Sequence, residues 1–164
     1  MRAALLALAL IATPALTEEP RTLALFPTHF NDTSTEGAIN GIREDETARL
    51  ALFDEALAEA MEGAGYDLAV LDPVEAQMDR TANVANCNGC AVRMGRELGV
   101  SHVMTAEVQK VSNLILALNV ALYDAETGEL LRLGSADIRG NDDRSWLRGQ
   151  RWLLKNRILK EDAE

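Results

Sequence analysis

The sequence predicts a single α/β domain in which helices cover one mixed β-sheet of about five strands in a three-layer arrangement. In the first two thirds of the chain, short apolar runs alternate with segments of helical periodicity, which is typical of parallel strands joined by helices. In the last third, long segments alternate apolar and polar residues around a short turn, which is typical of antiparallel strands. The expected order is therefore β-α-β-α-β-β-β-α.

The first 15 residues have the features of a signal peptide. A basic start at Met1-Arg2 is followed by an apolar run from Ala3 to Ala12, and Thr13-Pro14-Ala15 supplies small residues for cleavage after Ala15. The apolar run is much shorter than the roughly 20 residues that cross a bilayer. We therefore expect residues 16–164 to form one periplasmic domain without a membrane span, or a secreted domain if the cell has a single membrane. An uncleaved anchor is the alternative.

The first part of this domain alternates strands and helices. Apolar residues recur at helical spacing from Leu50 to Met61, and Asp45 is a suitable N-cap for this helix. The expected elements are a strand at 21–27, a polar loop from about 29 to 35, a helix from Asp45 to Gly63, a strand at 68–71, a weakly helical segment to about 85, and a helix at about 91–98.

The last part of the chain predicts a hairpin followed by a closing helix. Apolar residues hold period two from Leu114 to Leu122, and Ala125-Glu-Thr-Gly128 is a turn sequence. The expected strands are 102–111, 114–122 and 130–138. After the polar loop 140–143, Trp146 and Leu153 fall on the apolar side of the last helix.

The charge of the chain is unevenly distributed. The formal net charge is −10, which argues against general binding to nucleic acid or anionic lipid. The segment 139–160 is nevertheless net +5, since seven basic residues face only two acids. These basic residues either neutralise the protein's own acidic surface or dock to an acidic partner. For docking, the candidate residues are Arg144, Arg148, Arg151 and Lys155, with Trp152 as an exposed apolar anchor and Trp146 in the core.

Cys87 and Cys90 are the only two cysteines, and only Asn88 and Gly89 separate them. In an exported chain this spacing favours a structural disulfide that holds the start of the following helix. The alternative is thiol-disulfide exchange, with Cys87 as the attacking thiol and Cys90 as the resolving thiol. Exchange proteins place such a pair directly after a strand, and residues 80–86 do not predict one.

Metal and hydrolase sites are less well supported by the sequence. His29 and His102 are available to complete a Cys2His2 zinc site with the cysteine pair, but nothing in the sequence brings them together. His29, Asp32 and Ser34 have the residue types of a hydrolase triad, yet they lie within one hexapeptide, where a turn is the simpler interpretation. We expect no metal and no cofactor.

Several short segments resemble known bacterial domains. The pieces Leu25-Phe26 with Phe30-Asn31-Asp32-Thr33-Ser34, then Arg96 to Val103, then Asp124 to Gly128, resemble the N-terminal domain of TolB and the envelope proteins CsgG, LpoB and FlgO. The cysteine pair together with Ile138-Arg-Gly-Asn141 and Ser145-Trp146 more closely resembles a family of small exported bacterial proteins known only as a domain of unknown function. The resemblance implies a five-stranded mixed sheet of anticodon-binding-domain type that binds partners and has no known catalysis.

The sequence thus favours a non-catalytic periplasmic interaction module, an accessory or assembly factor for an envelope complex or a periplasmic enzyme. Its expected partner is another periplasmic or envelope protein with an acidic surface. The alternatives are thiol-disulfide exchange and, third, capture of a small ligand or metal. The predicted contact residues are Asn31, Asp32, Thr33, Ser34, Arg144, Arg148, Arg151, Trp152 and Lys155.

Overall fold

The computed structural model describes residues 20–160, so the expected signal peptide and its cleavage after Ala15 lie outside the described residues. The strands are β1 (Thr22–Leu25), β2 (His29–Asp32), β3 (Asp67–Leu68), β4 (His102–Ser112), β5 (Ile115–Asp124) and β6 (Leu130–Ile138). The helices are α1 (Thr35–Asn40), α2 (Glu44–Gly63), α3 (Glu75–Met78), α4 (Cys90–Leu98) and α5 (Asp143–Leu153). Single helical turns add η1 (Asp72–Val74), η2 (Val84–Asn86) and the π-helical η3 (Leu154–Ile158).

The strands form one mixed sheet in the order β3-β1-β4-β5-β6, and β2 pairs with the same side of β4 as β1 does. Strands β1, β2 and β3 make only parallel pairs, whereas β4, β5 and β6 pair antiparallel. The mixed sheet expected from the sequence is therefore confirmed, with the short parallel strands at one side and the long antiparallel strands at the other.

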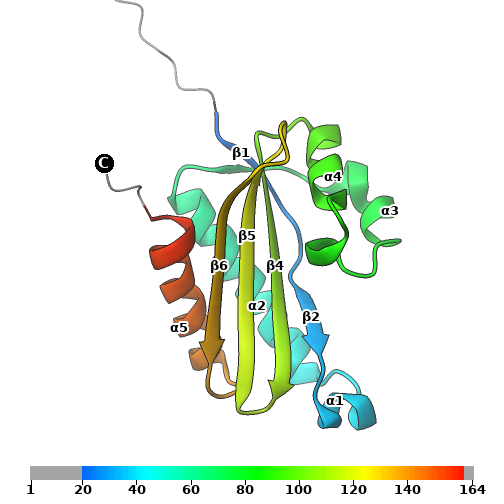
Figure 1. Cartoon of the computed structure of the whole chain (residues 1–164), viewed down its shortest axis with the longest axis vertical. Helices are drawn as coiled ribbons and strands as arrows, with labels where there is room; N and C mark the ends of the chain where they lie inside the picture. The colour runs from blue at the N-terminus through cyan, green and yellow to red at the C-terminus, as the bar shows by residue number, and fades with distance from the viewer. Residues whose placement is uncertain (1–19, 161–164) are drawn as a thin grey trace, which may run out of the picture.

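Helices cover the two faces of this sheet unequally (Figure 1). Helices α2 and α5 lie behind the sheet, and α4 lies on the opposite side near β1 and β4. Alternate strand residues face opposite sides, so Met104 packs toward α2 while its neighbour Val103 packs toward α4. Each covered face of the sheet therefore has its own apolar cluster.

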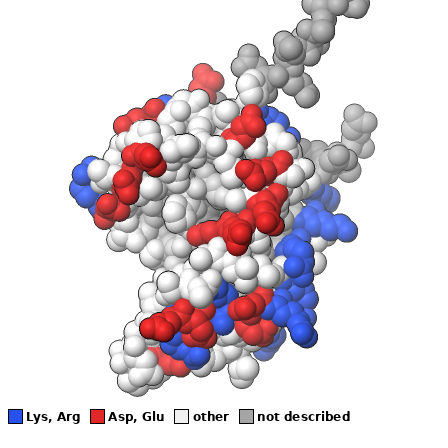
Figure 2. Space-filling model, turned by 180° about the vertical axis from the view of Figure 1, so that it is seen from behind, with Lys and Arg blue, Asp and Glu red and all other residues white. Residues whose placement is uncertain are grey.

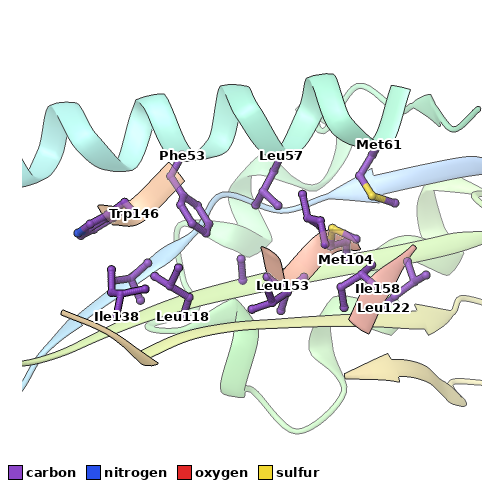
Figure 3. Packing of buried hydrophobic residues seen from close by; sticks show 14 of the residues in the cluster. Phe53, Leu57, Met61, Met104, Leu118, Leu122, Ile138, Trp146, Leu153 and Ile158 are labelled. Carbon is purple, nitrogen blue, oxygen red and sulfur yellow. The ribbon is translucent and has the colours of Figure 1, made fainter. Parts of the chain in front are cut away.

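The larger cluster lies between the sheet and helices α2 and α5 (Figure 3). Phe53, Leu57 and Met61 project from one side of α2, at the spacing that keeps helical residues on one face. Trp146 has no exposed surface, and its ring packs edge-on against that of Phe53, with 6.0 Å between ring centroids. The sequence prediction that Trp146 belongs to the core is confirmed.

The segment expected to be a loop from residue 29 instead forms β2 and then α1. β4 has eleven residues and β1 only four, so the far end of β4 offers unpaired backbone groups that β2 satisfies. No alternating pattern indicates this strand in the sequence, because Phe30 is its only buried residue.

Smaller differences concern element boundaries. The second strand is limited to Asp67–Leu68, and α2 begins at Glu44 with Arg43 as its N-cap, not Asp45. The predicted end at Gly63 and the predicted short helix before Gly99 are confirmed. Within residues 20–160, no helix is both long enough and apolar enough to span a membrane.

Candidate functional site

Four basic residues form one exposed face of the last helical segment, which we call the basic face: Arg144, Arg148, Arg151 and Lys155. They are separated by four, three and four residues, the spacing that aligns side chains along a helix. The opposite side of α5 buries Trp146, Gln150 and Leu153 against the sheet and α2. Packing of the apolar side therefore fixes the basic residues toward solvent.

No carboxylate of the described residues forms an ion pair with the basic face. Figure 2 shows the Lys and Arg side chains gathered along one side of the molecule, beside a band of Asp and Glu side chains. Helix α2 carries exposed Glu55 and Glu59, which line a groove with Arg151 but make no ion pair with it. Residues 20–160 thus show no direct ion pair that neutralises the basic face, although Asp142 interacts electrostatically with Arg144.

Trp152 lies at the edge of the basic face and is 48 % exposed, as expected for an apolar anchor. The guanidinium of Arg157 lies over its ring, 5.8 Å from the ring centroid. Large exposed aromatic side chains flanked by arginine are enriched at the centres of protein interfaces. The structure therefore brings together all five predicted contact residues of the last helical segment.

The other predicted contact segment, Asn31 to Ser34, is mostly engaged within the protein. The Asp32 carboxylate accepts a hydrogen bond from the Ser34 N–H at 2.8 Å and pairs with Lys110. Ser34 is buried and caps α1 by accepting from the Gly37 N–H. Thr33 is exposed and Asn31 is partly exposed. A partner-binding role for this segment stays a prediction, and it is limited to the two side chains that solvent reaches.

Asp32 belongs to a buried ion cluster centred on Lys110. The Lys110 ammonium has no exposed surface and lies 2.6 Å from Glu46, 3.1 Å from Asp32 and 3.2 Å from Glu36. These groups come from β4, α2, β2 and α1, so the cluster joins four elements at one end of the sheet. An ammonium buried this completely requires such partners, because burial of an unpaired charge is costly.

Asn141 extends this cluster to the last helix. Its side-chain N–H donates to Glu46 at 2.7 Å, and its oxygen accepts from the Trp146 indole and from Arg49, each at 3.0 Å. Arg49 also pairs with Asp143 at 2.8 Å. The residues Asn141 and Trp146, which carried the sequence resemblance, therefore have a structural role here: they attach the start of α5 to α2.

The hydrogen bonds of the cluster shift the pKa values of its members. Burial alone would raise the pKa of Asp32, but hydrogen bonds from Ser34 and the charge of Lys110 outweigh it, so the pKa lies below its ordinary value. Burial alone would lower the pKa of Lys110, but the carboxylates, Glu46 first, raise it above its ordinary value. Both groups are held in their charged forms, which suits a structural cluster rather than proton transfer.

Cys87 and Cys90 lie side by side, with their Cα atoms 5.5 Å apart and their sulfur atoms at bonding distance. The preceding segment is the short turn η2, not a strand, and α4 begins at Cys90 itself. Gly89 precedes the helix with a φ of 82°, a conformation that glycine adopts without strain. The pair therefore closes a tight bend at the start of α4, and no described feature indicates thiol exchange.

The two histidines do not join the cysteines. The His102 ring packs edge-on against Tyr66, with 5.3 Å between ring centroids, and its pKa is lowered by burial and by Arg21. His29 begins β2. No group of three or more His, Cys, Asp or Glu residues in the described part of the chain is placed to hold a metal.

Sequence reasoning missed Lys110, Glu46 and Arg49. A signal was present for Lys110, because period two places it on the same side of β4 as the buried residues Met104 and Val108. Glu46 and Arg49 likewise precede Phe53 at helical spacing on the buried side of α2. A charged residue in register with core residues indicates a buried ion pair.

A family model described as "Protein of unknown function (DUF2380)" matches residues 21–158. The chain belongs to this family. The match spans every described helix and strand, and it includes the ion cluster, the cysteine pair and the basic face. A comparison with curated proteins finds no match.

Among solved structures, the DUF2380 chain is similar to C-terminal domains of LpoB. The LpoB C-terminal domain from Salmonella enterica matches with a TM-score of 0.53 and 18% identity over 76% of this chain and 87% of that one. Lipoprotein GNA1162 from Neisseria meningitidis matches with a TM-score of 0.51 and 20% identity over 76% and 84%. A PelC dodecamer chain from Paraburkholderia phytofirmans matches with a TM-score of 0.50 and 11% identity over 86% and 89%. At these identities the likeness concerns the fold.

Proposed function

We propose that this DUF2380 domain is a non-catalytic interaction module outside the cytoplasm, an accessory or assembly factor that binds an acidic surface of another envelope protein. One observation carries the proposal: the basic face and Trp152 form an exposed cationic surface without described ion-pair partners on a strongly acidic molecule. Such a surface attracts acidic partners electrostatically and offers an apolar anchor at its edge. The similarity to LpoB-type envelope domains supports the same role and a periplasmic location.

The test compares two charge-reversal variants of residues 16–164. Arg148→Glu/Arg151→Glu changes the basic face, and Arg80→Glu/Arg93→Glu makes the same charge change at other exposed positions. Each protein is immobilised and exposed to envelope extract, captured proteins are identified by mass, and direct binding of a purified candidate is measured by calorimetry. We expect the first variant to lose binding at least about tenfold and the second to keep it. Equal binding by both variants would reject the basic face as the contact surface.

The reduction potential of the cysteine pair separates this proposal from the thiol-exchange alternative. A potential below about −300 mV agrees with a structural bridge, whereas one between about −230 and −120 mV agrees with exchange chemistry. Equilibration against glutathione, followed by thiol alkylation and mass measurement, gives this value.

A further inference from the structure

Strand β6 is the long open edge of the sheet. It has nine residues and only β5 as a neighbour, whereas the opposite edge strand, β3, has two residues. The strand contains no proline and no lysine, which are common protections of exposed edges. Within the described residues, β6 is thus the edge best able to accept another strand.

The register shows which backbone groups of β6 face outward. The Gly140 N–H donates to the Leu114 carbonyl at 3.2 Å, in the register that pairs Ile138 with Leu116. Because hydrogen bonds alternate along an antiparallel ladder, every second residue back from Ile138 bonds to β5, and the residues between turn their N–H and C=O groups to the open side. These outward residues are Leu133, Ser135 and Asp137. No described residue makes a side-chain or turn hydrogen bond to their backbone groups.

A groove of about 490 Å³ runs beside this edge, lined by residues 135–139 of β6 and by Arg148, Gly149 and Trp152 of α5. Helix α5 packs closely on the sheet at Gly149, so the exposed side chains of Arg148 and Trp152 border the open edge. An added strand lies about 4.8 Å from its neighbour. Alternate side chains of such a strand would then pass beneath Trp152.

We propose that β6 binds an extended acidic segment of the partner protein as an additional strand of the sheet. The inference rests on the proposed function and specifies how its partner is bound. Backbone hydrogen bonds to the outward groups of β6 give the binding energy common to strand addition, and side-chain pockets give its specificity. Side chains of an added strand alternate between the two faces, so the carboxylates of the segment face Arg148 beside Trp152 on the α5 side, and the apolar residues between them lie on the other face beside the exposed Leu133.

Charge favours this occupant over a second copy of the chain. Pairing of β6 with β6 of another copy about a two-fold axis would continue the sheet and bring two basic faces side by side on the same surface. Arg148 and Arg151 of each copy would then lie near their counterparts, and no described ion pair compensates their charge. An acidic segment meets the same groove with charge of opposite sign.

The probe is a labelled peptide of alternating Glu and Val, about eight residues long, which matches a typical strand. Its controls are a peptide of the same composition with Glu and Val in separate blocks, and an alternating Lys and Val peptide. Binding is measured by fluorescence anisotropy, and backbone amide exchange is followed by NMR. We expect saturable binding of the alternating acidic peptide alone and slower exchange at the Ser135 and Asp137 amides.

Two variants separate strand addition from simple charge attraction. Ser135→Pro removes an outward N–H, at an edge position where proline is tolerated, and Ser135→Ala is its matched control. We expect at least about tenfold weaker binding for Ser135→Pro and unchanged binding for Ser135→Ala. Circular dichroism checks folding, and if Ser135→Pro does not fold, the exchange of the two amides in the natural chain decides the question.

The outcomes distinguish failure of this inference from failure of the proposed function. If Arg148→Glu/Arg151→Glu abolishes binding of the peptide, but the bound peptide protects neither amide, strand addition is overturned. The basic face then remains the contact surface. Binding that Arg148→Glu/Arg151→Glu leaves unchanged overturns the role of the basic face. If sedimentation shows a dimer, and the same two amides are protected without peptide, then β6 pairs with β6 of a second copy. The acidic segment is then not its partner. No saturable binding up to about 1 mM overturns the strand-addition inference.

Discussion

Lys110 is a charged residue in the interior of the protein, and its stability contribution depends on its partners. Removing the ammonium in Lys110→Met would leave Glu46 and Asp32 close together without a cation between them. Breaking a buried pair from one side typically costs about 3–5 kcal/mol, because the remaining charge stays desolvated. We expect a loss of this size in the free energy of unfolding measured with urea.

Two further variants test this explanation at the residue scale. Lys155→Met removes an exposed lysine and should change stability by less than about 0.5 kcal/mol. In Lys110→Met/Glu46→Gln, the loss should be smaller than the sum of the two single losses, because both changes affect one interaction. Additive losses would mean that Lys110 and Glu46 do not act through one interaction, and a loss below about 1 kcal/mol for Lys110→Met would mean that the cluster contributes little to stability.

At the element scale, close packing of α5 on the sheet depends on glycine. A Cβ atom at position 149 would overlap Ile138 and come within 2.9 Å of Leu118, so α5 sits on β5 and β6 only without a side chain there. Gly149→Ala should therefore destabilise the fold by about 1–3 kcal/mol, the usual cost of overpacking. Gly63→Ala is the control, since a Cβ there meets nothing within 4 Å, and we expect no destabilisation. Equal urea midpoints for both variants would contradict this packing argument.

The elements that the sequence predicted well are those with a strong internal period. Strand β5 alternates buried and more exposed residues from Leu116 to Val120, and α5 carries core residues at helical spacing. Strand β2 was missed because a partner strand, not its own pattern, makes it a strand: it forms by pairing with the free end of β4. The same limit explains the boundary of β3, whose two residues are defined by pairing with β1.

At the scale of the whole molecule, the sequence predicted the part of the candidate site that is set by solvent exposure of a helix face. It did not predict the part that is set by contacts between segments distant in the chain. The basic face follows from periodicity, since the positions opposite Trp146 and Leu153 must face solvent. The inward orientation of Asp32 and Ser34 did not follow, because it requires Lys110 from a strand 78 residues later than Asp32 in the chain. A polar loop sequence is compatible either with an exposed surface loop or with a buried residue that caps a helix.

The ion cluster also predicts how the stability of the whole protein depends on pH. The folded-state pKa of Asp32 lies below its ordinary value of 3.8, so its contribution is present above that value and is lost as the pH falls through the lower folded pKa. The folded-state pKa of Lys110 lies above its ordinary value of 10.5, so its contribution is present below that value and is lost as the pH rises through the higher folded pKa. Asp54 acts in the opposite direction, because burial raises its pKa and protonation therefore favours the folded state.

We therefore expect the melting temperature to fall on both sides of a neutral plateau, and the alkaline decline to identify Lys110. In Lys110→Met the protein is less stable throughout, but the part of the alkaline decline that comes from this ammonium is removed, so the decline becomes shallower. Lys155→Met should keep the full alkaline decline of the natural chain, since Lys155 is exposed and forms no described ion pair. Calorimetric scans from acid to alkaline pH measure these slopes. An alkaline slope that is the same in Lys110→Met and the natural chain would show that Lys110 is not held charged by its carboxylates in the fold.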